Sequence, residues 1–195
     1  MAKEIQMKNF LLSLFGIVAL SLTLLPIQSQ AASGGASGGH SFLVGLSFMQ
    51  LSQTTEGPNL GTTDSTSTIL NGKIGYILSD GLYFGGIYDS RTDTTNGAKN
   101  ERTGYGASVG YHNMGWFIDG SYFISSTYKL SGGVELSGGS GFGADVGKNF
   151  DLTSNIYLGL QISYRSFTYT KAAGVNATNK IKSELTPMLN LGVMF

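Results

Sequence analysis

Apolar residues alternate with polar or small residues through most of this chain. The clearest example is the last stretch, Leu185–Phe195 (LTPMLNLGVMF), in which Leu189, Leu191, Val193 and Phe195 share one parity. A period of two is typical of a β-strand that has one apolar face. Similar alternation occurs at residues 40–51, 67–78, 82–91, 102–112, 115–126, 134–148, 155–169 and 181–195. The pattern predicts an all-β chain of eight antiparallel strands.

The predicted connections between these segments are of two kinds. Those after the second, fourth and sixth segments are short, such as Ser79-Asp80-Gly81. The others are longer and polar, at about 52–66, 92–101, 127–133 and 170–180. Short turns at one end and long loops at the other are typical of a transmembrane β-barrel, with the turns periplasmic and the loops extracellular. A soluble β-sandwich also alternates, so the connections favour the eight-stranded up-and-down transmembrane barrel.

The aromatic residues of the predicted outer face also favour a membrane barrel, because they gather near the strand ends. Two aromatic belts at the headgroup levels are expected for a barrel in a bilayer. Near the short turns lie Phe42, Tyr76, Phe84, Tyr111, Trp116 and Phe195. Nearer the loops lie Phe48, Tyr88, Tyr105, Tyr122 and Tyr164.

The amino terminus has the features of an export signal. Lys3 and Lys8 precede an apolar run at residues 10–25, which is short for a membrane span of about 20 residues. Ser29 and Ala31 provide small residues at the −3 and −1 positions of a cleavage site. We therefore expect a signal peptide at 1–31, a Gly/Ser-rich flexible linker at 32–39 and a barrel domain at 40–195, with a retained membrane anchor as the alternative.

The closing segment resembles the last strand of bacterial outer-membrane β-barrels, which commonly ends in Phe and is read by the barrel assembly machinery. Leu189, Leu191, Val193 and Phe195 are the residues that match, whereas Asn190 stands where that family usually has Gly. With the repeated alternation and the turn and loop layout, the chain from residue 40 resembles the small eight-stranded barrels: the OmpA membrane domain and its OmpX-like and OmpW-like relatives, with the subfamily left open.

This resemblance implies a location in the outer membrane of a Gram-negative cell. The partners it implies are outer-membrane lipids and lipopolysaccharide, the assembly machinery and periplasmic chaperones, together with an extracellular ligand at the loops.

The inward parity carries charges of both signs. A charge is costly against lipid and in a dry lumen, so these groups are expected to pair inside the barrel. The set has five of each sign and is expected to form a lumen charge network: Lys73, Asp89, Arg91, Arg102, Asp119, Glu135, Asp145, Arg165, Lys182 and Glu184.

Composition excludes several chemistries. Cysteine is absent, so the chain has no disulfide and no thiol nucleophile. The part after residue 31 has ten Lys and Arg against eleven Asp and Glu, which argues against a nucleic-acid partner. The two histidines, His40 and His112, map to the turn end, far from the loops. No cofactor, metal site or enzyme activity is expected, although an acidic site among Glu56, Asp64, Asp93 and Glu101 stays open.

Two function classes remain open from the sequence. One is a structural or surface-interaction barrel whose loops meet the outside of the cell. The other is a narrow gated channel or transporter for small solutes or hydrophobic molecules, which would pass through the lumen or a lateral opening. Ser, Thr, Asn and Gly dominate the loops and favour the first class.

Overall fold

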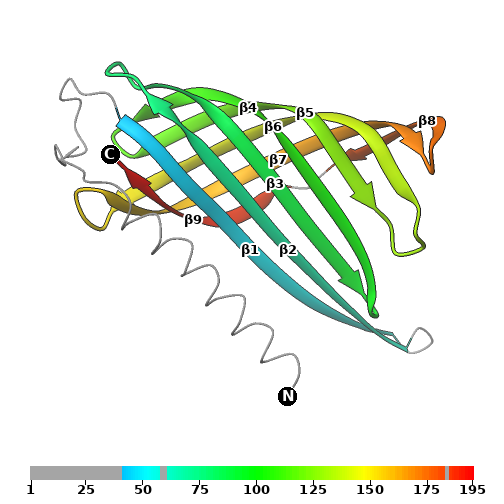
Figure 1. Ribbon diagram of the computed structural model, residues 1–195. Coiled ribbons are helices and arrows are strands. Elements are labelled where there is room, and N and C mark those ends of the chain that lie inside the picture. The colour runs from blue at the N-terminus through cyan, green and yellow to red at the C-terminus, as the bar shows by residue number, and fades with distance from the viewer. Residues whose placement is uncertain (1–40, 58–60, 183–184) are drawn as a thin grey trace, which may run out of the picture. The chain divides into compact units, whose positions relative to one another are not determined.

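The computed structural model describes residues 41–57, 61–182 and 185–195, and these fold almost entirely as antiparallel strands (Figure 1). The strands of the described part are β1 (Ser41–Gly57), β2 (Gly61–Ile77), β3 (Leu82–Thr95), β4 (Ala98–Asn113), β5 (Trp116–Lys129), β6 (Glu135–Asp151), β7 (Ile156–Ala172), β8 (Val175–Lys182) and β9 (Thr186–Met194).

The sheet closes on itself. Its order is β6-β5-β4-β3-β2-β1-β9-β7-β8, and β6 also pairs with β7, which completes the ring. β9 pairs with the first part of β7 and β8 with the last part, so the two follow one another along the same edge. The prediction of an all-β antiparallel barrel is confirmed. The described part contains nine strands where eight were predicted, and β8 and β9 pair with successive parts of β7, with residues 183–184 between them outside the described part.

The predicted signal peptide, its Ser29 and Ala31 cleavage site, the linker and His40 lie outside the described residues. Within the described residues, no helix has the length and hydropathy needed to cross a membrane.

The two faces of the barrel wall differ as the alternation predicts. Along β5, Phe117, Asp119 and Ser121 are buried, whereas Ile118 is 62% exposed. The outer face keeps large apolar side chains in the open, with Phe142 66% exposed on β6. A soluble protein rarely leaves so much apolar surface uncovered.

The predicted long loops are wrong, because most of those residues are strand. β3 and β4 meet at Asn96-Gly97 and β7 and β8 at Ala173-Gly174, each a pair of residues with positive φ. Two consecutive positive φ angles define the type I′ turn, which suits a tight hairpin, and the Asn-Gly dipeptide is its strongest sequence signal. Thr-rich alternating segments continue the strand pairing beyond the predicted strand ends. The end of the barrel where long loops were predicted, which we call the loop end, therefore consists of extended hairpins.

Inward aromatic rings lie against inward glycines of their own or a neighbouring strand, and Tyr83 is an example. The Tyr83 side chain is fully buried and lies against Gly75 and Gly85. A Cβ atom on Gly85 would lie 2.5 Å from the Tyr83 hydroxyl oxygen and closer still to the carbonyl oxygen of Ile74. In contrast, a Cβ on Gly86, which faces outward, would come no closer than 3.7 Å to any atom. Gly85 thus makes room for the ring.

Gly85→Ala should lower the free energy of unfolding of the refolded protein by about 1–3 kcal/mol, because a backbone oxygen and a buried ring must both move. Gly86→Ala is the matched control and should leave it within about 1 kcal/mol of the parent value. Urea titration followed by tryptophan fluorescence measures both. Equal effects at the two positions would contradict the inward placement of Gly85.

Candidate functional site: the charged lumen

A connected set of charges crosses the middle of the barrel interior. It contains three cations and three carboxylates from six different strands, all at most 9% exposed: Lys73, Asp89, Arg102, Asp119, Asp145 and Arg165. The structure therefore brings together six of the ten residues predicted for the lumen network.

We call these six residues the charge ladder. Lys73 of β2 lies on the side of the charge ladder nearest the short turns. Its ammonium nitrogen is 2.6 Å from Asp119 Oδ2 on β5 and 2.9 Å from Asp145 Oδ2 on β6. β2 is bonded to β1 and β3, so both contacts reach across the lumen. One cation thus balances two carboxylates that neither neighbouring strand of β2 provides.

Arg165 of β7 continues the ladder and also spans the lumen. Its Nη1 donates to Asp145 Oδ1 at 2.8 Å, and its Nε lies 3.8 Å from Asp89 Oδ2 on β3. Asp89 is paired in turn with Arg102 of β4, at 2.8 Å from Nη2. In the amide orientation that matches donors with acceptors, Asn71 donates to Asp89 Oδ2 at 2.7 Å and accepts from Arg165 Nη2 at 3.0 Å.

His112 joins the ladder at its turn-end limit, which sequence reasoning missed. Its Nε2 is 3.0 Å from Asp119 Oδ1, and its ring lies 5.0 Å from that of Tyr83 and 5.4 Å from that of Phe117. The seven-residue separation of His112 and Asp119 across a two-residue turn was the available signal, because such a turn places these strands side by side.

Buried apolar side chains lie on both sides of the charge ladder. At the turn end, Leu43, Tyr83 and Tyr157 form a buried cluster. Toward the loop end lies a second cluster, made of Ile87, Phe123, Leu136, Phe167 and Tyr169. Arg102 lies 4.4 Å from the centroid of the Phe167 ring, so cation–π contact joins this second cluster to the ladder.

The remaining predicted lumen residues lie elsewhere. Arg91 is half-buried nearer the loop end and donates to Asp93 at 2.8 Å. The prediction for Glu135 is wrong: its side chain is exposed, and Leu136 points inward instead. Register shifts between β5 and β6 at Phe123–Tyr128 exchange the two faces there. Of Lys182 only the backbone is described, and Glu184 lies outside the described residues.

The loop-end acids are solvated or locally paired. Asp64 accepts a hydrogen bond from Thr54 at 2.9 Å. Lys99 donates to Glu101 and thereby lowers the pKa of that carboxyl. The side chain of Glu56 is outside the described part. Among the described residues, no group of three or more His, Asp or Glu side chains is arranged to hold a metal ion.

The predicted assembly-signal residues lie on the outer face of the closing strand. Leu189 and Leu191 are exposed, and Val193 and Phe195 are half-buried. Phe195 and Phe42 exchange two backbone hydrogen bonds of 3.0 Å, and their rings stack with centroids 6.4 Å apart. The last residue therefore helps to join the two ends of the barrel.

The ring is joined less completely at this closing position. The β1–β9 ladder runs from Leu43↔Met194 to Phe48↔Leu189, whereas β1 pairs with β2 along its whole length. Beyond Phe48, the described part of β1 pairs with β2 alone, and β8 pairs with β7 alone. Figure 1 shows the β1–β2 hairpin diverging from β8 toward the loop end. We call this break between β1 and β8 the seam.

Comparison with known proteins yields structural similarities alone. No family model matches the chain, and no curated protein does. Neisserial surface protein A has a solved structure with 18% identity and a TM-score of 0.42, over 81% of this chain and 96% of that one. The β domain of the Bordetella autotransporter BrkA has 16% identity and a TM-score of 0.32, over 80% and 69%.

Arg165→Met should lower the free energy of unfolding by about 3–5 kcal/mol, because it leaves Asp145 and Asp89 short of a buried partner. Lys99→Met removes the exposed pair with Glu101 and serves as the control, with an expected cost below about 1 kcal/mol. Urea titration of refolded protein measures both. If Arg165→Met lowers the free energy of unfolding no more than Lys99→Met does, the charge ladder adds nothing to stability.

Proposed function

We propose that this chain is a small integral β-barrel of the bacterial outer membrane with a structural or surface-interaction role. The observation that carries the proposal is the contrast between the two faces of the wall. Its outside presents exposed apolar residues such as Ile118, Ile124 and Phe142, and its inside holds the charge ladder. That arrangement is stable where the surrounding solvent is hydrocarbon.

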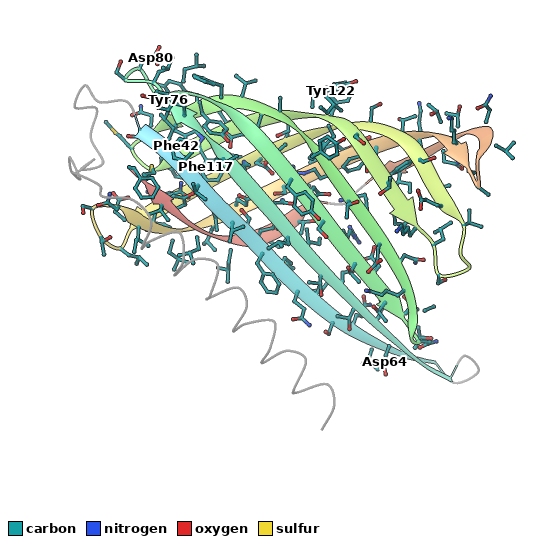
Figure 2. The ribbon with its side chains drawn as sticks, in the orientation of Figure 1. Phe42, Asp64, Tyr76, Asp80, Phe117 and Tyr122 are labelled. Carbon is teal, nitrogen blue, oxygen red and sulfur yellow. The ribbon has the colours of Figure 1, made fainter. Side chains whose placement is uncertain are left out.

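The aromatic side chains of the outer face form two belts. The turn-end belt consists of Phe42, Tyr76, Phe84, Tyr111, Trp116, Phe150 and Phe195, and the loop-end belt of Tyr88, Tyr105, Tyr122, Phe142 and Tyr164. Neighbouring members meet across strands, with Tyr76 and Phe84 centroids 6.0 Å apart and those of Tyr122 and Phe142 5.2 Å apart. In Figure 2, Phe42 and Tyr76 lie near the Asp80 turn, and Asp64 lies at the opposite end of the barrel. Such belts mark the two headgroup levels of a bilayer.

The contacts inside the barrel favour a filled core rather than an open pore. Six buried charges balance one another, and an apolar cluster lies on each side of them. An eight-stranded barrel is just wide enough for its own side chains to fill. The proposal therefore assigns contact with the surroundings to the loop-end hairpins, with no catalytic step and no cofactor.

Polar contacts between neighbouring strands support the proposal that these hairpins form a binding surface. Ser52 and Thr66 lie 3.4 Å apart, Thr103 and Thr127 lie 3.1 Å apart, and Asn96 accepts from the backbone N–H of Asp64 at 3.0 Å. An ordered sheet of hydroxyl and amide groups suits a polar extracellular ligand such as the sugars of lipopolysaccharide or a host surface.

An epitope inserted between Asn96 and Gly97 should be labelled by antibody on intact cells, because this tight turn lies at the loop end. The same epitope inserted between Asp80 and Gly81, at the turn end, should be labelled only after the outer membrane is permeabilised. Heat-modifiable gel mobility of both variants checks that each barrel has assembled. The reverse labelling pattern would invert the topology, and labelling of neither site in any fraction would contradict exposure at the surface.

A second candidate function, lateral passage of small apolar molecules, is favoured by the seam. The β1–β9 ladder ends at Leu189, and the next β9 residue that faces β1 is Pro187, which has no N–H to donate. Pro187 pairs with Ile162 of β7, two residues from Tyr164 in the loop-end belt. The break therefore begins at hydrocarbon depth on that side, where an apolar molecule could leave the loop-end half of the barrel for the bilayer.

Pro187→Val should slow the uptake of an apolar fluorescent probe by cells that produce the protein, because the restored N–H can extend the β1–β9 ladder and narrow the seam. Leu189→Val, within the paired part, is the control and should leave the uptake rate unchanged. Amide hydrogen exchange at Gln50, the next β1 residue whose N–H faces β9, reports whether the β1–β9 ladder has lengthened. A longer ladder with unchanged uptake would exclude the seam as the route.

A further inference from the structure

Lys148 of β6 is the feature that the charged lumen does not account for, because it lies on the outer face of the barrel. It has the parity of Val146 and Phe150, which are exposed, whereas Gly147 and Asn149 are buried. Among the described residues, no other charged side chain lies on the outer face within or between the two aromatic belts.

Among the described residues, aromatic rings lie next to Lys148 and no carboxylate forms an ion pair with it. Its register partners are Trp116 on β5 and Leu160 on β7. The ammonium nitrogen lies 5.0 Å from the centroid of the Trp116 ring and 5.5 Å from that of Phe150. No salt bridge of Lys148 occurs in the described part of the chain. The ammonium is thus contacted by two rings, and no described residue neutralises its charge.

The depth of Lys148 explains how such a charge is tolerated. A lysine on the lipid face is costly at the bilayer midplane but is tolerated with little cost near the interface. Trp116 and Phe150 both belong to the turn-end belt, which places Lys148 at the headgroup level of the periplasmic leaflet. Its long stem can lie on apolar neighbours while the ammonium reaches the lipid phosphates.

We propose that Lys148, Trp116 and Phe150 form a binding site for the phosphate of one anionic phospholipid of the periplasmic leaflet. The ammonium supplies the positive charge, and the indole N–H of Trp116 is a further donor for a phosphate oxygen. The exposed side chains of Val146 and Leu160 form the wall along which an acyl chain packs. This inference rests on the proposed location in the outer membrane.

Charge complementarity selects an anionic lipid over a zwitterionic one. The phosphodiester of phosphatidylglycerol is the only charge of its headgroup, so the interaction with Lys148 is purely attractive. A phosphatidylcholine headgroup brings its own cation beside the Lys148 ammonium, and that repulsion reduces the gain. Because the site lies at the interface, salt should weaken the preference.

Trp116 is the only tryptophan in the chain and lies within the proposed site, so its fluorescence reports on the lipid bound there. The protein is refolded into vesicles that mix brominated and unbrominated lipids, and quenching by brominated phosphatidylglycerol is compared with quenching by brominated phosphatidylcholine. The ratio of the two gives the relative affinity at the site. We expect a several-fold preference for phosphatidylglycerol, which falls to about one in Lys148→Gln and is retained in Lys148→Arg.

Lys99→Gln, which removes an exposed cation at the loop end, is the matched control and should keep the parent preference. Quenching by both lipids with no preference, or a preference that survives Lys148→Gln, would overturn the lipid site while leaving the membrane barrel intact. If neither brominated lipid quenches Trp116, the outer face does not contact hydrocarbon and the proposed function itself fails.

Discussion

The structure depends on satisfying backbone polar groups by closing a sheet. Strands β2 to β7 bond to a neighbour on either side through most of their length, and the ring is completed by β6–β7 and by the shorter β1–β9 ladder. In a closed sheet, successive side chains point in turn to the inside and to the outside of the barrel. The alternation of polar and apolar residues along the sequence follows from this. The seam is the place where the described backbone departs from the rule, and Pro187 stands where the departure begins.

A ring this small must then be filled by its own side chains, and three layers do so. Aromatic rings that lie against inward glycines occupy both ends, and Tyr83 on Gly75 and Gly85 and Tyr157 on Gly45 and Gly192 are two examples. The middle layer contains charges, which need partners as well as space. Lys73 and Arg165 have side chains long enough to cross the lumen, and each reaches two carboxylates from other strands. Size complementarity and charge balance thus act on the same set of inward positions.

Much of this was predictable from the sequence, because a period of two assigns faces without knowledge of the fold. The inward placement of Lys73, Asp89 and Arg165 and the outward placement of Ile118 and Leu158 follow directly from parity. Parity fails where a strand is irregular, so Glu135 was assigned to the wrong face after the register shifts between β5 and β6. The loop-end hairpins were missed because Thr-rich polar segments read as loops, although the Asn96-Gly97 turn was visible. Which charges meet across the lumen depends on the stagger of distant strands, and alternation has no information on that. For Lys148, parity gives the correct outward face, but the proposed role depends on the neighbouring Trp116 and Phe150 rings, which only the structure shows.

The way in which Arg165 joins Asp89 on β3 to Asp145 on β6 has a consequence for biogenesis. In the proposed membrane setting, a half-inserted chain would hold Lys73 of β2 before its carboxylate partners on β5 and β6, and Asp145 before Arg165, so it would expose uncompensated charge inside a narrow barrel. Insertion that proceeds one hairpin at a time would therefore be penalised at each stop. If the proposed membrane location is right, the interior chemistry favours a concerted process in which the strands gather at the membrane surface and enter together, and the charges are neutralised only in the finished barrel.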